Sequence, residues 1–324
     1  MPFCGSLRGL GVGRTQPPDT AREEHNPLNV HGSSSRANGV GLVLAAAVLW
    51  GTTGTSQALA PIGATPASVG ALRLALGGSL LLGLTLLRGD WKGGRSWPLV
   101  PTAGAALFVA AYQLSFFAAV ARTGVAVGTM VAIGSSPVIA GILAIVLRKG
   151  FPGTRWLVAT ILAIIGCTLL TGAGGEVRVN LTGILLALCA GASYSLYTLA
   201  IKEILPDRHP DTVMAAVFCG GALLLSPLLF ASQLSWLLEP TGLLVALHLG
   251  AIATALSYSL FSRGLATIPV ATAVTLSLAE PLTASLLGIT VLGEKLTLGG
   301  ISGMVLLFAG LGLLALQPRH VWRN

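Results

Sequence analysis

The chain has 324 residues, of which 53% are hydrophobic and only 9% are charged. A soluble domain carries about 25% charged residues, so this composition excludes a soluble fold of that size and is also too apolar for intrinsic disorder. The net charge is +8, but the 19 lysines and arginines are scattered along the chain rather than gathered in one motif. This scatter argues against nucleic acid as a partner and leaves a protein that crosses a membrane many times.

Ten apolar stretches are long enough to cross a bilayer as helices, because about 20 residues span the hydrocarbon core. Their Leu- and Ala-rich runs lack the alternation of a membrane β-barrel. Residues 1–38 differ, since they have no apolar periodicity, and we expect a disordered tail there. The sequence thus predicts an all-α fold with spans at 40–60, 67–87, 99–120, 124–147, 154–172, 181–201, 212–231, 242–262, 268–292 and 296–316.

Lysine and arginine in the short loops predict the orientation of these spans. With the N-terminus in the cytoplasm, 15 basic residues fall on the inner side and three, Arg122, Arg178 and Lys295, fall outside. Arg73 lies within a span and completes the 19. We therefore expect a multi-pass protein of the cell membrane with both termini, including the tail, in the cytoplasm.

The two halves of the chain resemble each other at an offset of 144 residues. Pro137 then aligns with Pro281, and Phe117 aligns with Phe261. Each half holds five spans, and the halves are residues 39–172 and 180–318. Because five is an odd number, the second half crosses the membrane in the opposite orientation to the first. Inverted repeats of this kind are typical of secondary transporters, which bind substrate near the midplane where the halves meet.

Several motifs then indicate a family. They are the run Leu278 to Gly288, the turn Leu292 to Thr297, the glycine-rich stretch Gly300 to Gly310, Trp50-Gly51 and Leu256-Ser257-Tyr258. With these motifs the chain resembles the EamA-type members of the drug/metabolite transporter superfamily over about residues 40–316. One departure is basic Arg148-Lys149, where the first repeat of the family usually ends its fourth span with an acidic residue.

The resemblance implies a transporter of small polar organic metabolites, with amino acids the best-represented class, working as an exporter. A multidrug exporter and an uptake permease are the alternatives within that class. A receptor or a lipid-modifying enzyme is the alternative outside it, but no soluble output domain or clustered catalytic set supports either. There is no nucleotide-binding motif, and we expect no cofactor or metal.

Two formal charges, Arg73 and Glu280, lie deep in the expected spans. A charge at the bilayer centre costs about 2.5–3.5 kcal/mol on insertion scales, so such residues face a cavity or a partner. For Arg73 the alternative is a structural cation that caps carbonyls. For Glu280 it is a hydrogen-bonded packing acid beside Pro281. Whether the two pair is left open by the sequence.

Polar and aromatic side chains in mid-span suit a cavity for a small molecule better than an interfacial belt. The alternative for each is packing between helices. Ser136 joins them because it aligns with Glu280 across the repeats. The expected substrate-binding set is Trp50, Arg73, Tyr112, Gln113, Ser136, Tyr194, Tyr197, Tyr258 and Glu280.

Two smaller features complete the pattern. Gly299 and Gly303 form a small-residue face, which we interpret as helix-packing scaffold, with a homodimer surface as the alternative. Ser193 and His248 resemble parts of an intramembrane serine protease, but Tyr194 stands where that motif needs glycine. We therefore expect His248 to be a hydrogen-bonded packing residue. Expected partners are a small-molecule substrate and membrane lipids.

Overall fold

The computed structural model describes residues 28–91, 96–123, 125–147, 149–172, 180–293 and 297–316. Over these ranges the chain is helical and has no strand. The helices are α1 (Leu28–Ala58), α2 (Pro66–Arg88), α3 (Leu99–Thr123), α4 (Val125–Val146), α5 (Thr154–Gly172), α6 (Leu181–Ile204), α7 (Pro210–Ala231), α8 (Pro240–Leu247), α9 (Ser257–Thr267), α10 (Val270–Leu276), α11 (Ala279–Leu292) and α12 (Leu298–Ala315). Short 3₁₀ turns are η1 (Leu205–Asp207) and η2 (Ser235–Leu238), and η3 (His248–Leu256) is π-helical.

Ten spans emerge from these elements. Nine segments of the described chain are long and apolar enough to cross a membrane, and the apolar part of α5, Thr154–Leu170, is shorter. The eighth span is one continuous rod made of α8, η3 and α9, while the ninth is divided into α10 and α11. The all-α fold with ten spans, predicted from the sequence, is confirmed.

Capping side chains explain where several helices begin and end. Thr65 and Asn180 accept hydrogen bonds from the backbone N–H of Ser68 and Gly183, which satisfies free donors at the starts of α2 and α6. Gly89 ends α2 in the left-handed region at φ 72°, a conformation that glycine adopts without steric penalty.

The first helix begins earlier than the sequence predicted. α1 starts at Leu28, so residues 28–38 are helical rather than part of an unstructured tail, whereas residues 1–27 lie outside the described residues. No proline interrupts the stretch after Pro27, and extending a helix adds one hydrogen bond for each residue fixed. The tail boundary expected at residue 38 is therefore wrong by about three turns.

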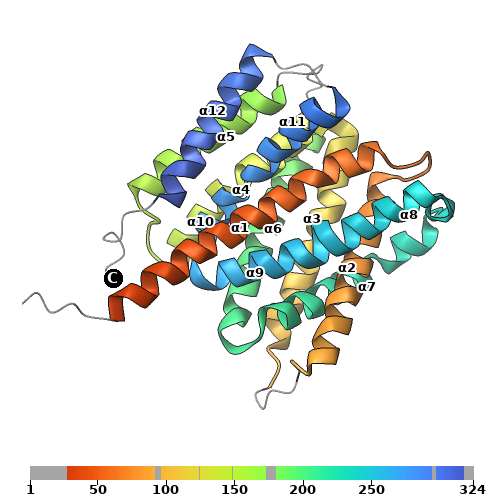
Figure 1. The fold of residues 1–324 in the computed structure, drawn as a ribbon, viewed down its shortest axis with the longest axis horizontal. Coiled ribbons are helices and arrows are strands. Elements are labelled where there is room, and N and C mark those ends of the chain that lie inside the picture. Colours follow the sequence, from red (N-terminus) through yellow and green to blue (C-terminus); the bar gives the residue numbers. More distant parts are fainter. Residues whose placement is uncertain are drawn as a thin grey trace, which may run out of the picture.

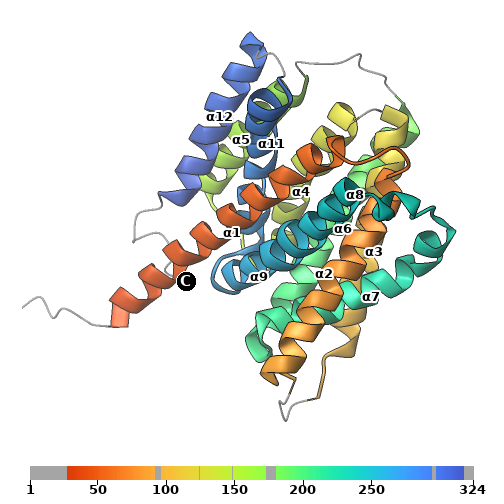
Figure 2. The ribbon, with the colours of Figure 1, turned by 45° about the vertical axis from the view of Figure 1, so that its right-hand side comes forward.

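The arrangement of the spans repeats itself between the halves. α5 packs along α12 at one edge of the bundle, and α2 packs along α7 at another (Figures 1 and 2). Between them, α3 packs on α6 as α9 packs on α1, and α4 packs on α6 as α11 packs on α1. Exchanging each span with its counterpart five spans away leaves this set of neighbours unchanged, which is what two related five-helix repeats require.

Glycines allow the closest helix contacts. A Cβ added to Gly303 would lie 2.6 Å from the carbonyl oxygen of Gly166, and a Cβ on Gly166 would lie 2.7 Å from that of Gly303. The backbones of α5 and α12 therefore touch at these positions. Gly303 is thus buried against α5, as expected of helix-packing scaffold, whereas Gly299 is only partly buried, and the dimer alternative stays a prediction.

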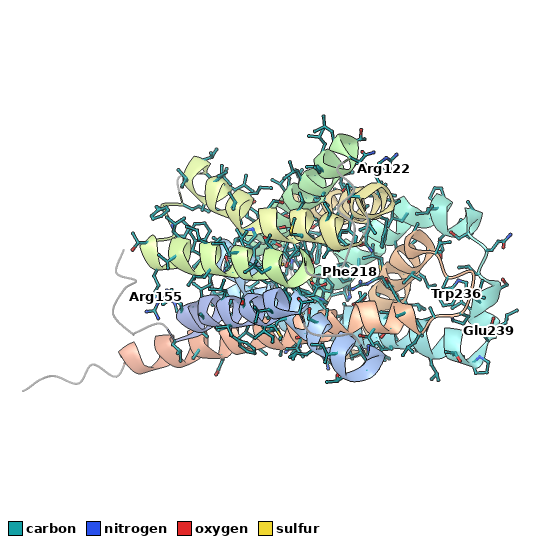
Figure 3. All side chains as sticks on the ribbon, turned by 90° about the horizontal axis from the view of Figure 1, so that it is seen from above. Arg122, Arg155, Phe218, Trp236 and Glu239 are labelled. Atoms are coloured by element: carbon teal, nitrogen blue, oxygen red, sulfur yellow. The ribbon has the colours of Figure 1, made fainter. Side chains whose placement is uncertain are left out.

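Charged residues gather at the ends of the bundle. Figure 3 shows Arg155 near one end, Trp236 and Glu239 near the other, and Phe218 in the interior between them. α1 begins and α12 ends at the Arg155 end (Figure 1). The guanidinium of Arg155 donates to the carbonyl oxygens of Leu313 (2.8 Å) and Leu316 (3.1 Å), and so satisfies acceptors at the end of α12.

A buried carboxylate ties three spans together near the same end. Asp211, in the first turn of α7, accepts hydrogen bonds from Arg263 (2.6 Å) and Arg88 (3.3 Å) and from the hydroxyl of Ser259 (2.5 Å). Its side chain is 1% exposed, whereas those of Arg88 and Arg263 are 49% and 41% exposed. This network links α2, α7 and α9.

Candidate functional site

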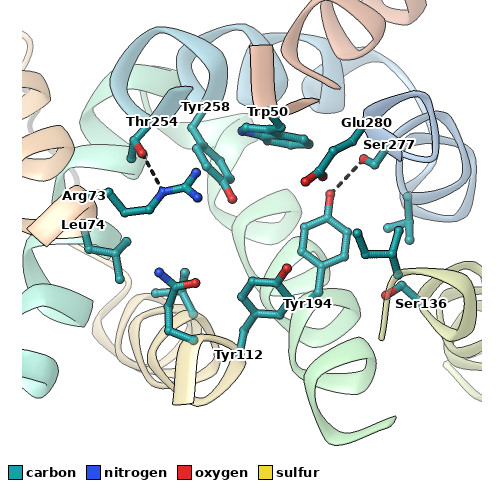
Figure 4. Close-up of a pocket in the computed structure, with 14 residues that line it drawn as sticks. Trp50, Arg73, Leu74, Tyr112, Ser136, Tyr194, Thr254, Tyr258, Ser277 and Glu280 are labelled. Carbon is teal, nitrogen blue, oxygen red and sulfur yellow. Dashed lines mark hydrogen bonds between the residues drawn. The ribbon is translucent and has the colours of Figure 1, made fainter. Parts of the chain in front are cut away.

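A polar cavity lies between the two repeats (Figure 4). Eight of the nine residues expected to bind substrate line it: Trp50, Arg73, Tyr112, Gln113, Ser136, Tyr194, Tyr258 and Glu280. They come from α1, α2, α3, α4 and α11 and from the sixth and eighth spans, so no single segment could form the cavity alone. The sequence did not single out the other lining residues, Leu74, Val109, Ile133, Thr254, Val274 and Ser277.

Arg73 is held at one side of the cavity by the π-helical part of the eighth span. Its Nε donates to the hydroxyl of Thr254 (3.0 Å) and its Nη2 donates to the carbonyl oxygen of Ala253 (3.1 Å). Glycines let α2 and η3 approach this closely, because a Cβ on Gly250 would lie 2.6 Å from the Cβ of Leu76. The guanidinium therefore has a fixed position and donor groups left over for a ligand.

Glu280 stands at the opposite side, in the first turn of α11 (Figure 4). The ninth span is interrupted just before it, since α10 ends at Leu276 and α11 begins at Ala279. Pro281 has no N–H with which to continue the helical ladder, and the backbone N–H of Glu280 instead bonds to the carbonyl of Ser277 at 3.0 Å. The interruption lies beside the cavity, since Ser277 and Glu280 on either side of it both line the cavity. Discontinuous helices occupy a comparable place in many transporters.

The two charges do not form an ion pair. The structure describes both Arg73 and Glu280, and their charged atoms are more than 4 Å apart. Among the described residues, none donates a hydrogen bond to the carboxylate of Glu280. Trp50 and Tyr258 lie between them in Figure 4. The question that the sequence left open is thus answered: the cavity holds two separate charged groups of opposite sign.

Aromatic rings form much of the wall. Trp50 and Tyr258 are 4.7 Å apart between ring centroids, and Tyr112 and Tyr194 are 6.0 Å apart. The Tyr194 hydroxyl and the Ser277 hydroxyl share a hydrogen bond of 2.9 Å (Figure 4). Such rings present both flat apolar surface and hydroxyl groups, which suits a small amphipathic molecule.

Tyr197 is the one expected site residue that does not line the cavity. It is buried, and its hydroxyl donates to the sulfur of Met214 at 3.8 Å. Together with the fully buried rings of Phe218 and Phe261 it fills the space next to the cavity. The packing alternative is therefore the one that the geometry favours for Tyr197.

Ser136 and Gln113 are at the edge of the cavity and already have backbone partners. Ser136 donates to the carbonyl of Ala132 (2.8 Å), and Gln113 donates through Nε2 to the carbonyl of Gly70 (3.0 Å). Two of the lining residues missed from the sequence follow from helical spacing. Thr254 precedes Tyr258 by four residues, and Ser277 precedes Glu280 by three, so each shares a face with a residue that was found.

The chemistry of the site is that of binding. Over the described ranges no group of three or more His, Cys, Asp and Glu residues is placed to hold a metal ion. His248, which the protease alternative needed, instead bonds through Nε2 to the hydroxyl of Thr52 at 2.9 Å. Two charges, hydroxyls and rings around one cavity between the repeats suit recognition of a polar solute.

A multi-pass helical protein with two five-helix repeats and a shared polar cavity is a membrane transporter rather than an enzyme. The chain belongs to the EamA-like transporter family, whose model matches residues 37–172 and 181–316. The two matches coincide with the two repeats, and they confirm the resemblance found in the sequence.

Known relatives agree with this class. The uncharacterized transporter YwfM of Bacillus subtilis is 48% identical over 278 residues, which is 86% of this chain and 93% of the relative. The threonine/homoserine exporter RhtA of Escherichia coli is 37% identical over 142 residues, which covers 42% of this chain and 46% of the relative. A solved crystal structure at 19% identity shares the fold, with a TM-score of 0.74 over 87% of this chain and 96% of its own.

Proposed function

We propose that this transporter exports small zwitterionic metabolites, amino acids among them, across the cell membrane. The observation that carries the proposal is the pair of unpaired opposite charges in one cavity. Arg73 offers donors for a carboxylate, and Glu280 offers acceptors for an ammonium group. An amino acid carries both groups, so it would supply a counter-charge to each of the two side chains, which have none within 4 Å in the structure.

The name of one relative supports the choice of substrate and of export, and the loop charges support the orientation of the spans. The relative RhtA, similar over nearly half of its length, is named as a threonine/homoserine exporter. The basic residues of the loops favour cytoplasmic termini, as expected from the 15-to-3 distribution. With no nucleotide-binding motif in the chain, export is driven by the substrate gradient or by protons.

The test is exchange of radiolabelled threonine by purified protein in liposomes. We expect wild type to exchange threonine for homoserine, and Glu280→Gln to lose almost all exchange because the amide keeps the shape but not the charge. Glu280→Asp should keep part, and Ser136→Ala should lose much less. Glu203→Gln is the matched control, since Glu203 is an exposed glutamate outside the cavity.

The double variant Arg73→Gln/Glu280→Gln separates recognition from structure. Because the two side chains do not pair, removing both charges should leave a folded and inactive protein. Restored exchange in the double variant, or full exchange by Glu280→Gln alone, would reject the proposal.

A further inference from the structure

A second space lies on the other side of Gln113. It is an apolar groove between α2, α3 and α7, and Gln113 is the single polar residue among the described residues that line it. Ala67, Leu114, Phe117 and Leu225 are among the others. Leu114 is 52% exposed, so the groove reaches the outer surface of the helical bundle, where we expect apolar side chains to face lipid. Gln113 lines both this groove and the polar cavity.

The Gln113 side chain occupies space that is free only because residue 70 is a glycine. A Cβ on Gly70 would collide with the ring of Phe117 and would lie 3.1 Å from the Nε2 atom of Gln113. The vacant position admits both side chains, and the Gly70 carbonyl accepts the hydrogen bond from Gln113. Gln113 is 7% exposed, and it is the one described residue that lines both spaces, so its side chain lies between them.

We propose that Gln113 is a specificity-determining residue, a partition that limits substrates to those whose apolar portion fits within the polar cavity. The inference rests on the proposed function for the identity of the substrate, but the partition itself is a matter of geometry. Removing the amide side chain should join the cavity to an apolar groove with a volume of about 280 Å³. The side chain of a longer amino acid then extends into that groove.

The expected gain follows from burial of apolar surface. Each methylene that enters an apolar site contributes about 0.8 kcal/mol, which is roughly fourfold in affinity. In Gln113→Ala the affinity for straight-chain 2-amino acids should therefore rise about fourfold per added carbon beyond four carbons. In wild type it should stay level or fall, because the amide blocks the longer chain.

The first measurement does not depend on the substrate. Ile133 lines the cavity from α4, and a protein with its native cysteines replaced by alanine and Ile133→Cys added carries one thiol there. A dodecyl maleimide dissolved in the membrane should label this thiol slowly in the Gln113 protein and at least tenfold faster with Gln113→Ala. Ala67→Leu, which fills the groove from α2, should reverse the increase.

A water-soluble maleimide reports whether each variant keeps a folded cavity. Gln113→Ser replaces Gln113→Ala if the alanine variant does not fold.

The second measurement is binding of 2-amino acids of four to eight carbons, followed by tryptophan fluorescence. Val109→Ala is the matched control, because Val109 lines the cavity on α3 but not the groove. It should enlarge the cavity without producing the dependence on chain length.

The outcomes separate the two proposals. Equal labelling by dodecyl maleimide with Gln113 and with Gln113→Ala, in folded protein, overturns the partition. If wild type neither binds nor exchanges threonine, the proposed function fails, while the labelling result still decides the role of Gln113. Faster labelling that Ala67→Leu reverses supports the partition in either case.

Discussion

The Asp211 network predicts a large loss of stability from one nearly isosteric change. Asp211→Asn keeps the shape of the side chain but leaves Arg88 and Arg263 beside a neutral amide. Breaking a buried ion pair costs about 3–5 kcal/mol because the partner charge is stranded. Both arginines are more than 40% exposed and can turn toward water, so the penalty is partly screened. We therefore expect a loss of about 2–3 kcal/mol, below the range for a fully buried pair.

The assay is thermal unfolding of purified protein in detergent at a fixed scan rate, since such unfolding is often irreversible. A loss of this size should lower the unfolding temperature by roughly 5–10 °C for a chain of this length. The control is Glu203→Gln. Glu203 pairs with Lys149 at 3.5 Å, and both side chains are about half exposed, so its removal should cost about 0–1 kcal/mol. Equal unfolding temperatures for Asp211→Asn and Glu203→Gln would refute the argument that burial distinguishes the two pairs.

Three further changes test other parts of the structure. Gly303→Ala should lower the unfolding temperature, because its Cβ would lie 2.6 Å from the Gly166 carbonyl oxygen. Gly312→Ala, whose Cβ meets nothing within 4 Å, should unfold at the wild-type temperature, and equal unfolding temperatures for the two variants would contradict the contact. For topology, Ile62→Cys should be labelled by an impermeant maleimide from outside the cell and Ser96→Cys only after permeabilisation, and outside labelling of position 96 would overturn the inverted arrangement. Deleting residues 1–27 should leave insertion and exchange intact, while deleting residues 1–38 removes the first three turns of α1 and should lower the yield of folded protein; equal yields would show that those turns add no stability.

The sequence predicted the fold and much of the cavity because a membrane restricts both which structures can span it and where polar side chains can lie. Uninterrupted apolar runs have few uses other than spanning helices, and a polar side chain within such a run is expensive unless it faces a cavity or a partner. For that reason Trp50, Tyr112 and Glu280 could be selected without any structure. The same reasoning chose Tyr197, which lies only three residues from Tyr194 and shares a broad face with it.

The features that the sequence did not predict arise from contacts between distant segments of the chain. Tyr197 is occupied by Met214, 17 residues away on the next span, so the depth at which the two helices meet decides its role. The π-helical turns of the eighth span have no composition signal, yet they present the Ala253 carbonyl and the Thr254 hydroxyl to Arg73. Turns of this kind are frequent at functional sites, and they come from tertiary packing rather than from local preference.

The unequal prolines of the two repeats have a consequence for the energetics of the cycle. Pro137 lies inside the continuous helix α4, whereas Pro281 follows a helix that has already been interrupted, and only the second repeat carries a charge at that place. Alternating access exchanges conformations between repeats, so the inward-open and outward-open forms of this chain are not mirror states and have different free energies. We therefore expect different half-saturation concentrations for substrate on the two faces of the membrane. Such asymmetry cannot by itself drive net flow, because a catalyst of exchange leaves the equilibrium unchanged. The direction of net transport is thus set by the gradients across the membrane, while the chain sets only the apparent affinity at each face.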